Sequence, residues 1–250
     1  MTFQTELVQT LHGPMYVLPN EVDPWVSRSY RELGEYSQSE FEFLKLILNV
    51  LGCQQGPLTV IDAGAYIGDL TIPLSRLVKE VYAFEPQAEI REVLKANLEI
   101  NRISNVTVLP YALADKERPL FYNTKSTSKD GNLGGNMMLD EGDHSVEVRT
   151  LDSLGLNPHF VKADIEGMEI PMIAGGEETL ARTRAPMFLE FDTVIVPEYN
   201  LLDVLRILGY NTYPRFFPIW NQHNFRKAET NPFGSTVSKM VLAVPPSVVF

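Results

Sequence analysis

A turn with two glycines carries the clearest chemical signal in this chain. Residues 60–75 read VIDAGAYIGDLTIPLS, in which Asp62 ends a predicted strand. Gly64 and Gly68 then lead into a predicted helix, where glycine lets the backbone approach a ligand and the helix N-terminus offers free N–H groups. Glu85 ends the next predicted strand, at a spacing that suits a carboxylate binding two ribose hydroxyls. We therefore predict a nucleotide-binding turn; an ordinary strand–turn–helix is the alternative.

The charge at this turn distinguishes between nucleotides. A dinucleotide would place its pyrophosphate near Asp62, whose carboxylate would repel it, and near Tyr66, where a small residue is needed. S-adenosylmethionine has no phosphate, and its sulfonium and amino groups are cationic. Its carboxylate can bind the helix N-terminus. The turn therefore favours S-adenosylmethionine as the cofactor.

The segment KADIEG places charged side chains at the end of a later predicted strand, where doubly wound folds bind their ligands. Asp164 and Glu166 are two residues apart, so in an extended chain they face the same side. Asp164 could contact the cofactor amino group or a metal, and Glu166 could accept a hydroxyl proton. Lys162 has the same phase and could neutralise them. The alternative is a buried ion-pair cluster that only orders the turn.

Further carboxylates, Glu190 and Asp192, end the next predicted strand. Asp164 and Glu190 together could bind Mg²⁺, which prefers oxygen ligands. Carboxylates near a cleft more often bind no metal, so the sequence commits to none.

The loop IWNQHNFRKAETNPF, residues 219–233, mixes aromatic and amide groups. That mixture suits stacking and hydrogen bonding to a saccharide or aromatic acceptor. His223 in this loop is a candidate general base, or else a surface histidine. His144 is a weaker candidate, and His12 and His159 are expected to be structural or solvated. The remaining candidates for acceptor contacts, with simple packing as the alternative, are Asn136, Met137, Met138 and Trp220.

Beyond residue 57, short apolar runs alternate with amphipathic stretches, which indicates a parallel sheet covered on both faces. The final two strands have no helix between them and are expected to pair antiparallel. Predicted strands cover residues 58–62, 81–85, 106–110, 160–164, 186–192, 210–219 and 237–244. Predicted helices cover residues 67–78, 88–101, 170–181 (broken) and 201–208.

The first 56 residues are expected to form an N-terminal extension with a cap helix, and residues 57–250 the cofactor-binding domain. Residues 1–34 are poorly periodic, and their prolines are expected to break any long element. Residues 37–52 predict a helix, with Ser37 and Glu40 at the spacing of a capping box. The Gly-rich and Ser-rich stretch 123–143 predicts either a lid or a merely flexible loop.

Composition limits the classes of partner. A hydrophobic content of 44% over 250 residues can bury one sizeable core. The net charge of -11 and the absence of a Lys/Arg-rich run argue against a nucleic-acid partner. Cys53 is the only cysteine, which fits a reducing compartment. We see no secretory signal and no apolar run long enough to span a bilayer, so a cytoplasmic protein is expected.

Five motifs in order, IDAGAYIG, AFEPQ, LKANLEINRISNVTVLPYALAD, TLDSLGLNPHFVKADIEGMEI and APMFLEFD, resemble the FkbM-type methyltransferase family over about residues 35–200. Two departures stand out: Tyr66 lies where Asn is common, and Ala163 lies where a larger aliphatic residue is frequent. The resemblance implies a class I methyltransferase fold, Rossmann-like, with a doubly wound, mostly parallel seven-stranded sheet. It also implies O-methylation of a sugar, glycan or similar small-molecule hydroxyl with S-adenosylmethionine as donor.

The resemblance also implies roles for individual residues. Asp62, Gly64 and Gly68 would line the methionine end of the cofactor, while Glu85 would hold the ribose. Glu35, Ser37 and Glu40 in the N-terminal segment would close over the cofactor. For Ser37 and Glu40, a capping box is an equally good or better explanation. The expected cofactor site is completed by Ala65, Tyr66, Pro86, Tyr111, Ala112, Leu113 and Asp164.

Two other functions compete with methyl transfer. A catalytically inactive cofactor-binding or sensor protein would keep the fold, and the complete set of charged residues argues against it. An NAD-dependent oxidoreductase is disfavoured by Asp62 and by the missing third glycine of the turn.

Overall fold

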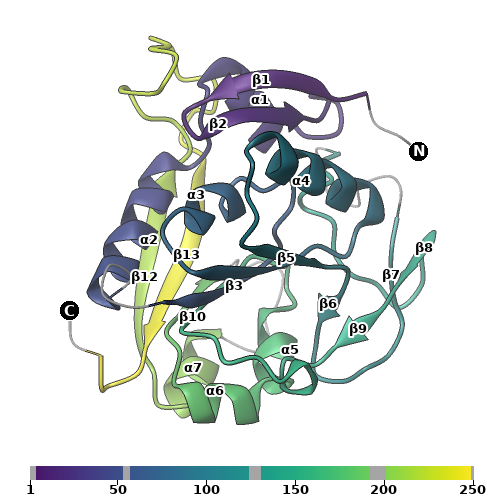
Figure 1. Cartoon of the computed structure of the whole chain (residues 1–250), viewed down its shortest axis with the longest axis vertical. Helices are drawn as coiled ribbons and strands as arrows, with labels where there is room; N and C mark the ends of the chain where they lie inside the picture. Colours follow the sequence, from purple (N-terminus) through teal and green to yellow (C-terminus); the bar gives the residue numbers. More distant parts are fainter. Residues whose placement is uncertain (1–3, 53–56, 124–130, 192–200, 249–250) are drawn as a thin grey trace.

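The computed structural model describes residues 4–52, 57–123, 131–191 and 201–248. At its centre lies a seven-stranded sheet with the order β12-β13-β11-β10-β3-β4-β5 (Figure 1). Neighbouring strands are parallel, except that β13 runs antiparallel to β11 and β12. This confirms the predicted α/β doubly wound sheet. The strands are β3 (Thr59–Ala63), β4 (Glu80–Phe84), β5 (Val106–Leu109), β10 (Phe160–Ala163), β11 (Met187–Glu190), β12 (Asn211–Pro218) and β13 (Val237–Val244).

The central strands are apolar on both faces because helices cover both. Val60 and Phe160 belong to one buried cluster, whereas their neighbours Ile61 and Val161 belong to another on the opposite face. The first face is covered by α2 (Gln38–Val50), α3 (Thr71–Ser75) and α4 (Ala88–Ile100), and the second by α5 (Glu169–Ala174), α6 (Glu177–Thr183) and α7 (Leu201–Ile207).

The N-terminal segment is more ordered than the sequence predicted. It forms a hairpin of β1 (Glu6–Thr10) and β2 (Gly13–Val17), followed by α1 (Val26–Glu32). All three elements are short, which agrees with the expectation that prolines prevent a long one, but the sequence did not predict them individually. Tertiary contacts stabilise the hairpin: Asn97 on α4 accepts the N–H of Tyr16 at 2.6 Å and donates to its carbonyl at 3.0 Å. Such contacts are not visible in local periodicity.

Local geometry departs from expectation at two helix starts. Ser37 does not form the predicted capping box; it has a φ of 44° and donates through its hydroxyl to the Glu40 carboxylate at 2.8 Å. The helix expected over residues 67–78 is shorter, because the turn from Gly68 occupies its first part and α3 begins at Thr71.

Four short strands accompany the main sheet, and the sequence did not predict them. β6 (Ala112–Leu113) pairs with β9 (Val148–Arg149), and β7 (Leu120–Tyr122) pairs with β8 (His144–Val146). They flank the stretch 123–143, of which residues 124–130 lie outside the described part of the chain.

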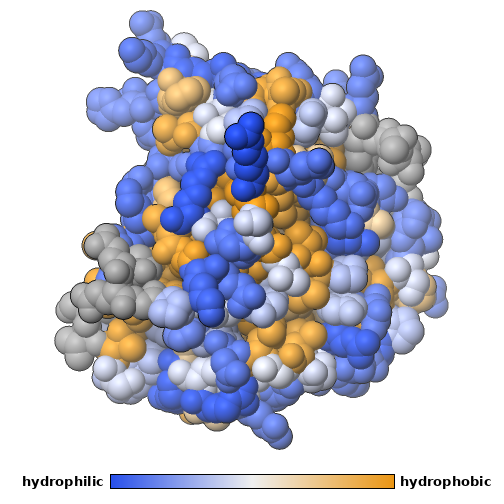
Figure 2. Space-filling view, viewed as in Figure 1, coloured by the Kyte–Doolittle hydropathy of each residue, from blue (hydrophilic) through white to orange (hydrophobic). Residues whose placement is uncertain are grey.

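The described residues include no helix that is long and apolar enough to cross a membrane. Figure 2 shows the face seen in Figure 1, where hydrophilic residues surround hydrophobic ones gathered near the middle and beneath the N-terminal hairpin.

Candidate active site

The carboxyl ends of β3, β4, β10 and β11 open into a cavity of about 710 Å³. Its roof comes from the N-terminal segment and from the ends of β12 and β13. This volume lies within the range of small-molecule sites. The lining residues are Trp25, Val26, Tyr36, Gly64, Tyr66, Asp69, Glu85, Gln87, Asn132, Gly134, Gly135, Met137, Lys162, Asp164, Glu166, Glu190, Ile219, Thr236, Val237 and Ser238.

Gly64 is required by the close packing of two strand ends. Its φ is 77°, and a Cβ there would lie 1.8 Å from the carbonyl oxygen of Asp164. Gly68 has a φ of 97°, with the Leu94 side chain 2.9 Å from its Cβ position. Tyr66, between them, also has a positive φ of 47°, a conformation that Asn tolerates better than Tyr. The positive φ explains why Asn is common at this position in the sequences that this chain resembles, and it leaves Tyr66 in a strained backbone conformation.

Glu85 fixes the glycine turn from the end of β4. Its carboxylate is buried and accepts the N–H of Tyr66 at 3.0 Å and that of Gln87 at 2.8 Å. Burial raises the pKa of Glu85 to about 7. The same side chain lines the cavity, as a ribose-binding carboxylate must.

Lys162 is a buried cation that also lines the cavity. Its ammonium lies 3.4 Å from Oδ1 of Asp62 and donates to the carbonyl of Gly64 at 3.1 Å. Burial alone would lower the pKa of Lys162, but the carboxylates of Asp62, Asp164 and Asp69 raise it well above its usual range. Asp62 also accepts the Thr71 hydroxyl at 2.5 Å and does not line the cavity. Asp62 and Lys162 therefore form an ion pair that supports the glycine turn from below.

Three carboxylates converge at the ends of β10 and β11. Asp164, Glu166 and Glu190 each place an oxygen within 4.8 Å of the others, and all three line the cavity. Burial, followed by the charges of Asp164 and Glu166, raises the pKa of Glu190 well above its usual range. Oxygen ligands at such distances are compatible with a divalent cation, as the sequence left open. Asp192, the other carboxylate considered there, lies outside the described residues.

Glu169 holds this carboxylate turn in shape. Its carboxylate accepts the N–H of Ile165 at 2.9 Å and that of Gly167 at 3.1 Å. Burial raises its pKa to about 7. Glu166 within the turn has a φ of 53°, which is a strained value. The two hydrogen bonds to Glu169 stabilise the turn in this conformation.

A small apolar annex adjoins the cavity and shares Gly64 and Glu85 with it. Its composition suits a flat heteroaromatic ring such as adenine. Tyr111 does not line it, because its ring lies under the guanidinium of Arg149, 5.3 Å from the ring centre. The apolar residues of the annex include Pro86, Ala112, Leu113, Met138, Ile165 and Met168.

The N-terminal residues suggested by the family resemblance lie outside the lining. Glu35 is buried and accepts the side-chain amide of Asn221 and the N–H of Phe225, the latter at 2.8 Å. Burial raises the pKa of Glu40 to about 7, and its carboxylate interacts with Lys162 and Ser37. Ala65 is buried behind the glycine turn.

None of the four histidines, all of which are described, lines the cavity. His223 is exposed, and its backbone N–H donates to the Asn221 side chain at 2.7 Å. His144 stacks on Tyr122 with ring centres 5.0 Å apart. The ring of His12 contacts Phe41, and His159 accepts the N–H of Thr59 at 3.0 Å. His12 and His159 thus have local structural partners.

Sequence reasoning missed several residues of the cavity. Asp69 lines it, and burial raises its pKa to about 7. The signal was present, because Asp69 follows Gly68 directly in the turn. Trp25 and Tyr36 gave no signal, since their place in the roof depends on contacts with distant segments. Of the acceptor candidates, Met137 lines the cavity and Asn136 and Met138 line the annex, whereas Trp220 packs beside Ile219 outside it.

The fold resembles those of known methyltransferases. A structure of an S-adenosylmethionine-dependent methyltransferase from Agrobacterium tumefaciens matches 98% of this chain and 72% of its own, with a TM-score of 0.54 and 10% identity. A structure of methyltransferase FkbM from Methylobacillus flagellatus KT matches 74% of this chain at 16% identity and a TM-score of 0.48. The match spans 43% of that second protein's chain. No curated protein sequence matches.

The fold is thus that of class I methyltransferases, as expected. A family model described as the methyltransferase FkbM domain matches residues 62–215, which is more than half of the chain. That range contains the glycine turn, Glu85 and the carboxylates of β10 and β11. The chain belongs to the FkbM family of methyltransferases.

Proposed function

We propose that this protein is an S-adenosylmethionine-dependent O-methyltransferase that acts on a hydroxyl of a sugar, glycan or similar small acceptor. The observation that carries the proposal is a cavity with an adjoining annex, in which apolar residues, Glu85, the glycine turn and a carboxylate cluster lie together. The proposal assigns the first three to the donor and the last to the acceptor.

The residues present fit the donor. Gly64 keeps its edge of the cavity free of a side chain, and Glu85 presents a carboxylate to the ribose. Pro86, Ala112 and Leu113 enclose the adenine position. S-adenosylmethionine supplies an activated methyl carbon and positive charge. The acidic lining favours that charge, because opposite charges attract strongly in a partly buried site.

Glu166 is proposed to accept the proton of the attacking hydroxyl. Methyl transfer is an in-line displacement, so the protein must align the acceptor oxygen and remove its proton. Glu166 is assigned this role because it lines the cavity within the carboxylate cluster, whereas burial and the neighbouring charges of Asp164 and Glu166 raise the pKa of Glu190 and favour its protonated form. Asp164, which lines the cavity at the end of β10, is assigned to the donor amino group. No step is assigned to a metal, so transfer is expected to persist after dialysis against EDTA.

Methyl transfer can be tested with labelled donor. The purified protein is mixed with [methyl-³H]S-adenosylmethionine and a panel of glycosides and small polyhydroxylated acceptors, and label in the acceptor is counted. Transfer to a hydroxyl supports the proposal. Tight binding of S-adenosylhomocysteine without transfer to any acceptor would favour an inactive cofactor-binding protein.

A further inference from the structure

Part of the cavity lies beyond the residues assigned to the donor. The glycine turn and Glu85 follow β3 and β4, and the annex extends from there to Asp164 and Ile165 after β10. A second part of the lining, which includes Glu190 at the end of β11 together with Trp25 and Tyr36, lies outside the annex. We propose that this second part is the acceptor subsite and that it takes a hydroxyl-bearing ring without phosphate or carboxylate groups. The inference rests on the proposed methyl transfer.

The roof is built from two segments that are distant in sequence. Trp25 and Tyr36 come from the N-terminal segment, while Ile219 and Val237 come from the ends of β12 and β13. The rings of Trp25 and Phe233 pack with centres 6.1 Å apart. A buried cluster at this junction contains Leu33, Ile219 and Phe233.

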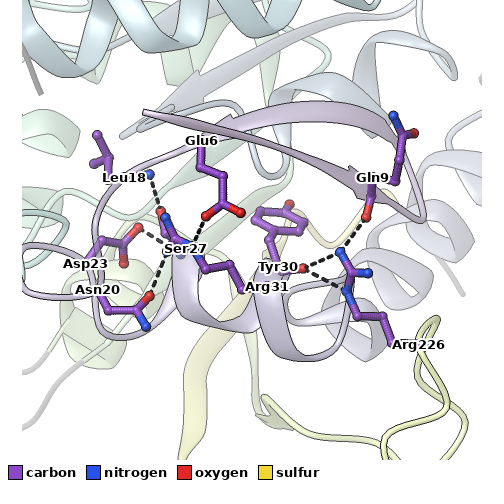
Figure 3. Close-up of polar contacts among 9 residues, drawn as sticks. All are labelled: Glu6, Gln9, Leu18, Asn20, Asp23, Ser27, Tyr30, Arg31 and Arg226. Atoms are coloured by element: carbon purple, nitrogen blue, oxygen red, sulfur yellow. Dashed lines mark hydrogen bonds and ion pairs between the residues drawn. The ribbon is translucent and has the colours of Figure 1, made fainter. Parts of the chain in front are cut away.

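Arg226 holds these two segments together (Figure 3). Its side chain donates to the carbonyl of Gln9 at 3.0 Å and to that of Tyr30 at 3.3 Å, and its backbone N–H donates to the carbonyl of Leu33 at 3.0 Å. Glu35 adds a second connection through the N–H of Phe225. The roof is therefore a braced part of the fold, able to present its aromatic side chains in fixed positions.

The proposed acceptor subsite combines aromatic faces with hydrogen-bond acceptors. Its aromatic side chains, Trp25 and Tyr36, are half-buried and offer flat apolar faces. In the same cavity, Glu166 and Glu190 offer oxygens that accept hydrogen bonds from hydroxyl groups. A ring with C–H groups on one face and hydroxyls on its edge matches both surfaces.

The charge of the cavity excludes acidic acceptors. The lining carboxylates are Asp69, Glu85, Asp164, Glu166 and Glu190. Among the described lining residues the one basic side chain is Lys162, and it is already paired with Asp62. A phosphate or carboxylate on the acceptor would therefore meet net repulsion. Acceptor charge is thus a specificity determinant of the subsite.

Binding to the protein saturated with S-adenosylhomocysteine tests this proposal without relying on turnover. The probes are neutral methyl hexosides and methyl deoxyhexosides, each paired with its uronate or 6-phosphate, and binding is followed by saturation-transfer NMR and calorimetry. At least one neutral probe is expected to bind ten or more times tighter than its acidic counterpart. Equal or tighter binding of the acidic members would overturn the proposal, as would the absence of binding by every neutral probe.

Substitutions of Trp25 test where the neutral probe binds. Trp25→Ala is expected to weaken the neutral probe at least tenfold while S-adenosylhomocysteine binding stays within twofold, which also shows that the protein is folded. Trp25→Leu, which keeps apolar bulk without an aromatic face, replaces it if Trp25→Ala fails to fold. Phe216→Ala, at a 60% exposed aromatic residue outside the cavity, is the matched control.

The outcomes separate the two proposals. A neutral probe that binds equally well to wild type and to Trp25→Leu would overturn the placement of the subsite. Failure of S-adenosylhomocysteine to bind would instead count against the donor assignment, and it is measured first.

Discussion

Lys162 and Asp62 are direct neighbours across β10 and β3, and their side chains form a buried ion pair with Nζ and Oδ1 3.4 Å apart. The parallel register therefore places the cation of the KADIEG segment against the acidic residue that begins the glycine turn. Two motifs separated by about a hundred residues are joined through this pair. Lys162 lines the cavity, whereas Asp62 does not.

Lys162→Met is expected to destabilise the protein by about 3–5 kcal/mol, because it leaves the buried Asp62 without its partner. The double variant Lys162→Met, Asp62→Asn should recover part of that loss. Urea unfolding at pH 7.5 gives the three free energies. Lys95→Met, at an exposed position on α4, is the control and should change stability by less than about 0.5 kcal/mol. Equal loss in single and double variants would contradict the pairing.

Gly64→Ala is expected to cost at least about 3 kcal/mol, because its Cβ would meet the Asp164 carbonyl oxygen in addition to adopting a positive φ. Gly155→Ala is the matched control. Gly155 has a φ of 63° and nothing within 4 Å of its Cβ position, so only the backbone cost of about 1–2 kcal/mol applies. Denaturant unfolding compares the two. Equal costs would show that the turn can separate from β10 without penalty.

The stability of the ligand-free protein is expected to fall as pH rises from about 5.5 to 8. Glu40, Asp69, Glu85 and Glu169 have folded-state pKa values raised to about 7 by burial, above ordinary values of 4.5 or 3.8. Between those values the folded state binds more protons than the unfolded state, so raising the pH favours unfolding. Thermal unfolding should show a midpoint several degrees lower at pH 8.

Replacing one of these carboxyl groups tests the cause of that pH dependence. Glu85→Gln should flatten it, whereas Glu92→Gln, at an exposed position, should leave it unchanged. A midpoint that rises from pH 5.5 to 8 would contradict the raised pKa values.

Glu166→Gln is expected to lower turnover by roughly 10²-fold or more, the scale of general-base catalysis, with donor binding within twofold. Turnover is measured with labelled donor once an acceptor is identified, and donor binding by calorimetry. Glu177→Gln, an exposed residue at the start of α6, serves as control. Intact turnover in Glu166→Gln would move the base elsewhere in the cavity, with Asp69 the next residue to replace.

The sequence predicted the main sheet well, because its buried parallel strands are short apolar runs bounded by turns. Each predicted strand matches an observed one within two residues, and the antiparallel last strand is confirmed. The N-terminal hairpin was missed because its order depends on Asn97 and Arg226, which lie far away in the chain. No local pattern encodes such contacts.

The residues of the candidate site were also predicted only in part. Gly64, Glu85, Asp164 and Glu166 were identified because glycine and carboxylate positions at strand ends are visible in sequence, and all four line the cavity. The sequence did not show that Asp62 lies below the cavity, since that follows from the register of β3 and β10. The sequence suggested that the N-terminal segment and the loop 219–233 lie near the ligands, but it did not identify Trp25, Tyr36 or Val237, because the roof is assembled from two segments with no shared motif.

Calorimetric titration tests whether the cavity binds an adenosyl donor held by Glu85. S-adenosylhomocysteine and NAD are titrated separately into wild type and into Glu85→Ala. We expect S-adenosylhomocysteine to bind the wild type one to one, and NAD not to bind. Binding of S-adenosylhomocysteine to Glu85→Ala is expected to be at least about tenfold weaker, which corresponds to about 1.4 kcal/mol. No heat at saturating S-adenosylhomocysteine, or binding of NAD in its place, would contradict the account.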